Sequence, residues 1–137
     1  MSSDQIDARG RSNIVTSEVR VQVESQYLPQ HSKPELDRYL FTYVVKITNE
    51  GPRPVQLLDR HWIITDAEGY VEEVEGPGVI GETPLISPGS SHQYRSFCPL
   101  NTPFGMMEGS YGMIDMEGNR FRVTVGLFTM ATPEAIN

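Results

Sequence analysis

Three glycines in the stretch VEGPGVIGETP (residues 74–84) have a spacing that can bind phosphate. Gly76, Gly78 and Gly81 read as G-x-G-x-x-G, the pattern that holds pyrophosphate in dinucleotide-binding folds. That chemistry needs a buried parallel strand before the glycines and a helix after them, because the helix N-terminus supplies free N–H groups. Here a threonine and a proline stand where the helix would begin, and the preceding YVEEVE is a charged, alternating strand. The context therefore argues against a dinucleotide site.

Two interpretations of this glycine-rich loop remain. In the first, Gly76 and Gly78 supply positive φ or a bulge, and Pro77 stiffens a bend between strands. In the second, successive N–H groups form a nest for a small anion such as pyrophosphate or a nucleotide phosphate. Four glutamates surround the loop and would repel an anion: Glu72, Glu73, Glu75 and Glu82. The charges favour the structural interpretation. If the loop does bind an anion, Gly76, Gly78 and Gly81 are the candidate site residues.

Acidic residues before the loop could offer oxygen ligands to a divalent cation. They are Asp66, Glu68, Glu72, Glu73 and Glu75. Strand alternation places Glu72 on the opposite face from Glu73 and Glu75, which favours a solvated hairpin whose charges protect a sheet edge. His61 and His92 have no second His or Cys at a zinc-ligand spacing. We predict no metal site.

Residues for catalysis are few. Cys98 could act as a nucleophile with His61 or His92 as its base, but a lone cysteine in a strand is typical of a buried apolar position. The chain has no G-x-S-x-G, H-E-x-x-H or Walker motif. We expect no catalytic residue, no cofactor and no enzymatic activity.

Two apolar groups have to be assigned either to the core or to a binding surface. Trp62 lies among isoleucines within a strand, which favours the core of a sandwich over a stacking platform. Phe104, Met106 and Met107 form an adaptable partner-binding patch if a loop exposes them, and belong to the core if they close one end of the fold. The patch is kept as a candidate partner contact.

Short alternating segments with turn signals between them account for the chain. They cover residues 18–24, 38–49, 55–66, 70–75, 94–98, 111–115 and 121–127. No segment has sustained helical periodicity, and SKPEL (32–36) is the one place for a short helical turn. We predict an all-β, antiparallel β-sandwich of about seven strands, with a small barrel as the alternative. Residues 1–13 are expected to be a flexible tail and residues 14–137 a single domain.

Composition limits the partners. The chain of 137 residues has a formal net charge of −7, which argues against binding nucleic acid directly or adsorbing to an anionic membrane. The polar start, MSSDQIDARGRSN, lacks the apolar core of a signal peptide, and no apolar run is long enough to span a bilayer. One cysteine fits a reducing compartment. We expect a cytoplasmic protein.

The motifs together resemble the ApaG family over residues 19–137. The similarity lies in RHWIITDAEG (60–69), VEGPGVIGETPLISPG (74–89), YRSFCPLNTPFGMMEGSYGM (94–113) and NRFRVTVGLFTM (119–130). Gly126 departs from the family pattern, which has a proline there, so the regularity of the last strand is in question.

The resemblance implies a fibronectin type III-like or immunoglobulin-like sandwich. It also implies a non-enzymatic module that binds a protein partner, in a family linked to cobalt resistance and magnesium efflux, whose eukaryotic members include an F-box protein and a polymerase-interacting protein. The glycine motif is a family feature discussed as a pyrophosphate site. The alternative function is therefore a binder of pyrophosphate, nucleotide or divalent cation at Gly76–Gly81.

Overall fold

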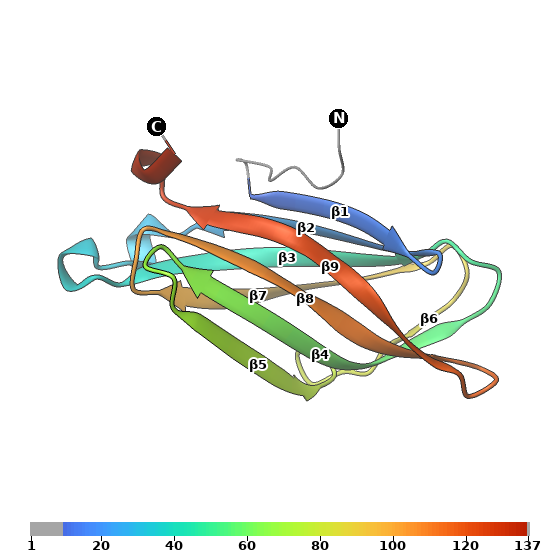
Figure 1. Ribbon diagram of the computed structural model, residues 1–137. Helices are drawn as coiled ribbons and strands as arrows, with labels where there is room; N and C mark the ends of the chain where they lie inside the picture. The colour runs from blue at the N-terminus through green and yellow to red at the C-terminus, as the bar shows by residue number, and fades with distance from the viewer. Residues whose placement is uncertain (1–9, 137) are drawn as a thin grey trace.

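Two packed antiparallel sheets make up the protein in a computed structural model that describes residues 10–136 (Figure 1). The strands in this range are β1 Arg11–Thr16, β2 Val19–Tyr27, β3 Tyr39–Asn49, β4 Val55–Asp66, β5 Val71–Pro77, β6 Leu85–Ile86, β7 Ser91–Leu100, β8 Phe104–Asp115 and β9 Arg120–Ala131. One sheet has the order β1-β2-β3-β7; the other has the order β5-β4-β8-β9, with β6 pairing to β4. The predicted sandwich is confirmed, and the barrel alternative is wrong because the strands divide between two sheets.

Two parts of the chain differ from the sequence prediction. Residues 11–13, expected in the tail, begin β1, because β1 pairs along the whole first half of β2. Gly10, directly before β1, is buried, and residues 1–9 of the predicted tail lie outside the described residues. Three 3-10 helices, η1 Pro29–His31, η2 Pro34–Leu36 and η3 Pro133–Ile136, complete the described elements. The expected turn in SKPEL is confirmed as η2.

Alternation along the strands builds the core. Val19, Val21 and Val23 of β2 are all 3% exposed or less, and the alternate residues of β3 from Phe41 to Ile47 are 5% exposed or less. Trp62 of β4 meets this layer from the other sheet. Its ring centroid lies 5.6 Å from Tyr43, 5.9 Å from Tyr111 and 6.2 Å from Phe128, in edge-to-face contacts. The prediction that Trp62 is a core residue is confirmed.

A β-bulge in β4 decides which side chains of this strand face the core. In β4 the register against β8 shifts between Leu57 and Asp59, so Leu58 is an extra residue. Since side chains alternate along a strand, one extra residue moves all later side chains to the opposite face. Leu57 and Trp62 therefore both face the core although five positions separate them, and Arg60, two residues before Trp62, also faces inward.

The second bulge lies at Gly126. The register of β9 against β8 shifts between Met107 and Gly109, where β9 has one residue more than β8. A Cβ at Gly126 would lie 2.6 Å from Cδ1 of Ile14, so the glycine lets β1 pack closely on β9. The last strand is thus continuous but bulged, and its irregularity has a packing reason.

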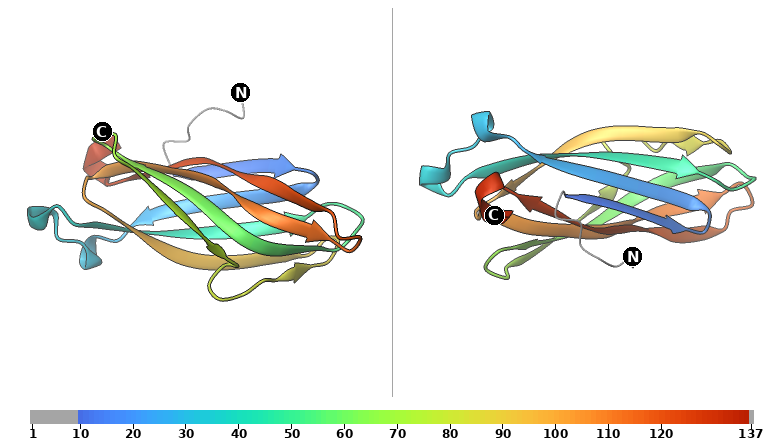
Figure 2. Two further views of the ribbon diagram at one scale, coloured as in Figure 1. Left: turned by 60° about the horizontal axis from the view of Figure 1, so that its bottom comes forward. Right: turned by 90° about the horizontal axis from the view of Figure 1, so that it is seen from above.

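The sandwich is closed along one side and open along the other. Strands β1 and β9 lie together at the upper side in Figure 1, whereas β5 and β7 are edge strands on the opposite side. The segment between β5 and β6 crosses this open side, which faces forward in the left view of Figure 2. We call residues 78–84 the roof loop.

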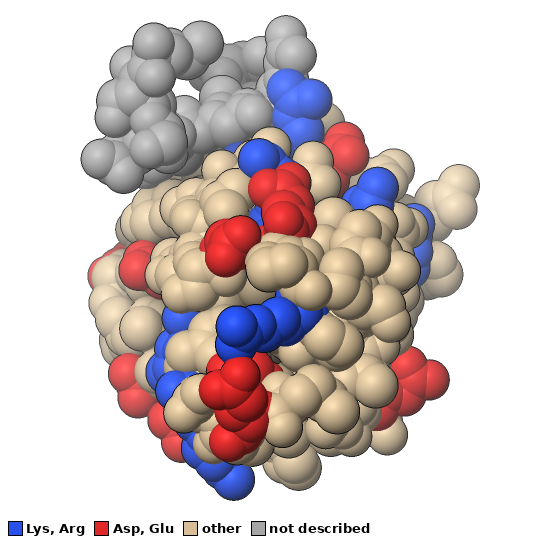
Figure 3. All heavy atoms as spheres, turned by 90° about the vertical axis from the view of Figure 1, so that its right-hand side faces the viewer, with Lys and Arg blue, Asp and Glu red and all other residues tan. Residues whose placement is uncertain are grey.

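The end formed by the β1–β2, β3–β4 and β8–β9 connections carries mixed charge. Arg20 pairs with Glu50 at 2.7 Å, and Arg53 pairs with Glu117 at 2.7 Å. Figure 3 looks onto this end and shows acidic and basic side chains next to one another. No basic surface of the kind that binds nucleic acid is seen on this face.

Candidate functional site

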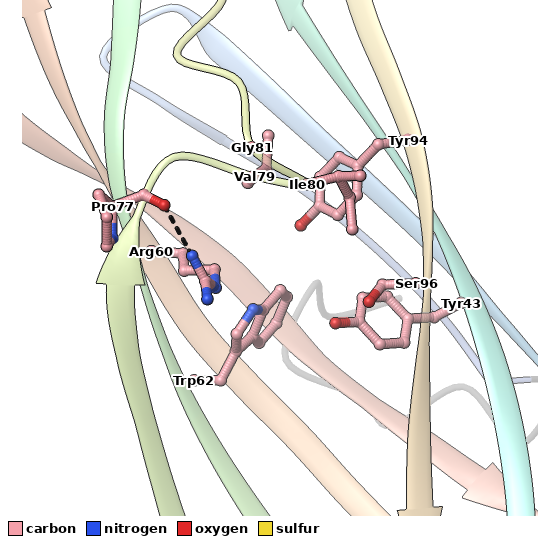
Figure 4. A pocket seen from close by; sticks show the side chains of 9 residues that line it. All are labelled: Tyr43, Arg60, Trp62, Pro77, Val79, Ile80, Gly81, Tyr94 and Ser96. Atoms are coloured by element: carbon pink, nitrogen blue, oxygen red, sulfur yellow. Dashed lines mark hydrogen bonds between the residues drawn. The ribbon is translucent and has the colours of Figure 1, made fainter.

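A cavity of about 320 Å³ lies between the two sheets at the open side. Strand β3 contributes Tyr43, β4 contributes Arg60 and Trp62, and β7 contributes Tyr94 and Ser96. Pro77 and roof-loop residues 79–81 close it. Figure 4 shows the hydroxyls of both tyrosines pointing toward the space in front of Arg60 and Trp62. The cavity therefore gathers polar groups from both sheets over an aromatic floor.

Arg60 brings a positive charge into this cavity. Its Nη1 donates to the carbonyl oxygens of Pro77 at 2.8 Å and Gly78 at 3.0 Å, which fixes the guanidinium under the roof loop. Within the described residues Arg60 forms no ion pair with a carboxylate, and no Asp or Glu lines the cavity. Arg20, Arg53 and Arg122, by contrast, each pair with an acidic side chain. A guanidinium in such a place is suited to hold an anionic group.

The hydroxyl groups that face Arg60 are neutral donors at ordinary pH. Burial raises the pKa of Tyr43, against the opposing effects of a hydrogen bond from Ser96 and the charge of Arg60. Burial also raises the pKa of Tyr94, whose hydroxyl forms a short hydrogen bond with that of Tyr111. Neither tyrosine becomes a phenolate near neutral pH. The Tyr43 hydroxyl can therefore act as a hydrogen-bond donor to a ligand oxygen.

The roof loop is a tight β-turn rather than an open nest. Val79 and Glu82 exchange two backbone hydrogen bonds, of 2.8 and 3.0 Å, around Ile80 and Gly81. Both central residues have positive φ, 47° and 74°, as a type I′ turn requires. The N–H of Gly78 donates to the Leu58 carbonyl at 2.8 Å. Three loop N–H groups are thus already paired within the protein.

Each glycine of the motif has a local structural reason. Gly78 has φ 61°, and a Cβ there would lie 2.3 Å from the Glu82 carbonyl oxygen. Gly76, the next-to-last residue of β5, lies against Arg60, and a Cβ there would be 2.9 Å from both terminal guanidinium nitrogens. The element that follows Gly81 is β6 and not a helix. The glycines form the turn and make room for Arg60.

The other residues singled out from the sequence do not join this cavity. Phe104, Met106 and Met107 lie in β8 and not in a loop; Met107 is 2% exposed and the other two are half-buried. For Met107 the core alternative is therefore confirmed, and its place in the candidate partner-contact patch is wrong, because its side chain is part of the core.

Cys98 is also a core residue, as favoured by the sequence. Burial, with a smaller effect of the Glu72 charge, raises the pKa of its thiol to about 12, so it is not a thiolate at neutral pH. His61 lies 3.5 Å from Glu75 and 3.9 Å from Glu73 on the outer face, and His92 lies 3.6 Å from Glu82. The polar side-chain contacts of both histidines are therefore with glutamates, whereas the thiol of Cys98 contacts the Pro99 carbonyl.

Among residues 10–136 no group of three or more His, Cys, Asp or Glu side chains is placed to hold a metal ion. None of the helices described there has the length and apolar character to cross a bilayer.

Sequence reasoning missed Arg60, Tyr43, Tyr94 and Ser96. One signal could have found Arg60: Leu57 and Trp62 are both large and apolar, and an odd spacing cannot put both in the core unless a bulge lies between them. No comparable signal marks the hydroxyl groups, because their convergence depends on how the two sheets pack.

Comparison with known proteins gives consistent matches. A family model described as the ApaG domain matches residues 29–115. Protein ApaG of Azotobacter vinelandii is 49% identical over 120 residues, which cover 88% of this chain and 95% of the relative. Protein ApaG of Rhodospirillum centenum is 49% identical over 119 residues, covering 87% and 92%.

Solved structures match as well. The crystal structure of a Bordetella pertussis protein described as ApaA has a TM-score of 0.83 at 43% identity, covering 88% of this chain and 98% of that one. The C-terminal domain of wzt, 12% identical with a TM-score of 0.54 over 96% of this chain and 88% of that one, shows a likeness of fold alone.

Proposed function

The chain belongs to the ApaG domain family, and we propose that it is a non-enzymatic binding protein whose interior cavity holds a small ligand by an anionic group. The observation that carries this proposal is Arg60, a guanidinium turned inward by the β4 bulge and left without a carboxylate partner among the described residues. The guanidinium is half-buried, and its bonds to two carbonyl oxygens leave its charge unpaired. A ligand anion would neutralise this charge, with the Tyr43 hydroxyl as a further donor.

The proposal changes where the glycine motif acts. Instead of binding an anion through its own N–H groups, the motif shapes the roof loop and gives Arg60 two carbonyl acceptors. Binding without catalysis fits the chemistry of the cavity, which offers hydroxyls and a guanidinium but no group suited to act as general base at neutral pH. The raised thiol pKa of Cys98 removes the nucleophile considered from the sequence.

Intrinsic fluorescence tests the proposal, because Trp62 is the only tryptophan of the chain and lines the cavity. The wild type should give a saturable change in emission with at least one of benzoate, pyrophosphate and ATP at millimolar concentration or below. Arg60→Met should abolish it, and Arg60→Lys should keep part of it because the charge remains. Arg95→Met, on the outer side of β7, is the matched control. A flat titration of the wild type with all three probes would contradict the proposal.

A protein-interaction role is the second candidate, and β7 is the observation that favours it. This free edge strand of ten residues contains one charged side chain, Arg95, whereas the edge strand β5 has three glutamates in seven residues. Charged side chains protect edges from pairing with other strands, so β7 is the less protected edge. Phe97 is 58% exposed on it. We propose that an extended segment of a partner protein pairs along β7 and packs an apolar side chain on Phe97.

The test of this role is a pull-down with variants of equal stability. Phe97→Glu should lose a captured partner without lowering the Tm. Leu36→Glu, at a 55% exposed position in η2, should retain it. Retention of every partner by Phe97→Glu would remove this candidate.

A cytoplasmic location is also part of the proposal, because a single cysteine fits a reducing compartment. The link of the family to cobalt resistance and magnesium efflux stays an expectation taken from the resemblance.

A further inference from the structure

We infer that the ligand of the Arg60 cavity is a small monocarboxylate with an apolar body, and not a phosphate compound. This inference rests on the proposed function and specifies its ligand. Three properties of the cavity lead to it: the part of the guanidinium that is free, the charge around it, and the size and character of the walls.

The free part of Arg60 matches a carboxylate. Nη1 is engaged by the Pro77 and Gly78 carbonyl oxygens, and the hydrogen bonds of the described residues leave Nε and Nη2 without an acceptor. These two nitrogens are neighbours on one edge of the planar group, and their parallel N–H bonds fit the two oxygens of one carboxylate. A phosphate would need donors for a third and fourth oxygen as well. Beyond Arg60 the lining offers Tyr43, Ser96 and Tyr94, and the Tyr94 hydroxyl already bonds to Tyr111.

The charge around the cavity also favours a monoanion. Arg60 is the only cation among the lining residues. One carboxylate neutralises it, whereas a dianionic phosphate or a pyrophosphate would leave net negative charge in a partly desolvated space. Glu82, the residue after Gly81 of the lining, and the net charge of −7 make that excess less favourable.

The walls define the rest of the ligand. The indole of Trp62, the side chains of Val79 and Ile80 and the tyrosine rings supply apolar surface beside the hydroxyl groups. This favours a ligand whose body beyond the carboxylate is mainly apolar. A cavity of about 320 Å³ lies at the lower end of the range for small-molecule sites and suits a compact ligand. Aromatic and branched aliphatic monocarboxylates have this size.

The experiment compares matched probes by Trp62 fluorescence and by amide chemical shifts. Benzoate and 3-methylbutanoate are the carboxylates, benzamide is the neutral analogue of benzoate, and inorganic phosphate and pyrophosphate are the competing anions. Benzoate should bind at least tenfold more tightly than benzamide and both phosphates, with shifts at Arg60, Trp62 and the roof loop. Arg60→Met should bring benzoate down to the level of benzamide, and Arg60→Lys should bind it more weakly than wild type.

Two other binding results would contradict the carboxylate inference, and they differ in what they mean for the proposed function. If pyrophosphate or phosphate binds as tightly as benzoate and Arg60→Met abolishes that binding, the inference is overturned while the proposed function stands. If benzamide equals benzoate and neither phosphate binds more tightly than they do, or if no probe binds, the anion site is wrong and both fail. Urea denaturation of Arg60→Met confirms that the variant is folded; should it be unfolded, Arg60→Lys with the same probes decides, since it keeps the charge but not the planar fork.

Discussion

At the scale of single residues, the roof-loop glycines show how one motif can serve geometry in place of ligand binding. Gly78 has both positive φ and a carbonyl oxygen where a Cβ would stand, while Gly81 has positive φ and open space around it. Substitutions at these two positions therefore distinguish the destabilisation caused by a left-handed backbone from that caused by a steric contact of the added Cβ.

We expect Gly78→Ala to destabilise the protein more than Gly81→Ala. The left-handed backbone alone costs an alanine roughly 1–2 kcal/mol, and Gly78→Ala adds a contact at 2.3 Å with the Glu82 carbonyl. Urea denaturation of both variants measures the difference in free energy of unfolding. Equal losses would show that the turn can move away from the added methyl group.

The buried thiol supplies a prediction about pH. The pKa of Cys98 rises to about 12, above the ordinary value of 9.0, so the unfolded chain loses this proton first. Stability from the protonated thiol is present below pH 9 and falls as the pH rises toward the folded-state value. Between about pH 9 and 10, before tyrosines titrate in the unfolded chain, the free energy of unfolding should decline less in Cys98→Ala than in wild type. A parallel decline in both proteins would mean that the thiol is accessible to solvent.

Burial of single residues could be predicted from sequence where it follows from an apolar side chain in an alternating strand. Trp62 and Cys98 are apolar groups in alternating strands, and both are buried as expected. Arg60 was missed because its direction depends on the extra residue Leu58, which only the pairing with β8 reveals. Alternation in one sequence thus predicts which face a side chain occupies, but the prediction fails after a bulge because the extra residue reverses the faces.

At the scale of elements, the hairpins β4–β5 and β8–β9 have turns of the same kind. DAEGY (66–70) and DMEGN (115–119) have the same spacing of Asp and Gly, and their glycines have φ of 88° and 87°. In each, the aspartate Oδ1 accepts two backbone N–H groups: Glu68 and Tyr70 in the first, Glu117 and Asn119 in the second. The turn residues were readable from sequence because an Asp–Gly pattern determines this geometry locally.

Asp115→Ala should lower the Tm at pH 7, because it leaves the turn N–H groups of Glu117 and Asn119 without their acceptor. The hydrogen bond from the Asn119 backbone holds the pKa of Asp115 below its ordinary 3.8. The stabilisation is therefore present above that ordinary value and is lost as the pH falls through the folded-state pKa. Thermal denaturation at pH 7 and below pH 3 should show a Tm difference that narrows in acid. Glu117→Ala, which removes only the exposed pair with Arg53, should change the Tm little at either pH.

At the scale of the whole molecule, the sandwich has one closed and one open side, and the cavity follows from that asymmetry. Gly126 lets β1 pack on β9 at the closed side, whereas β5 and β7 stay apart and the roof loop covers the gap. Sequence patterns predicted the sandwich but not this difference, because which strands become edges depends on pairings between distant segments. The β1 strand was missed for the same reason: its polar residues are fixed by pairing with β2 and not by their own alternation.

Glu82 of the roof loop approaches His92 of β7 in the opposite sheet, with its Oε2 atom 3.6 Å from the histidine Nε2 atom. Because this contact joins the two layers across the open side, Glu82→Gln should free the loop without loosening the core. Hydrogen exchange should become faster for the amides of 78–83 and stay unchanged in β3, since β3 lies in the interior of its sheet. A saturating carboxylate should restore part of the protection, because it would connect Arg60, and through it the Pro77 and Gly78 carbonyls, to the Tyr43 side of the cavity. Faster exchange throughout β3 and β7 would instead show that the contact stabilises the whole sandwich and that the loop does not move on its own.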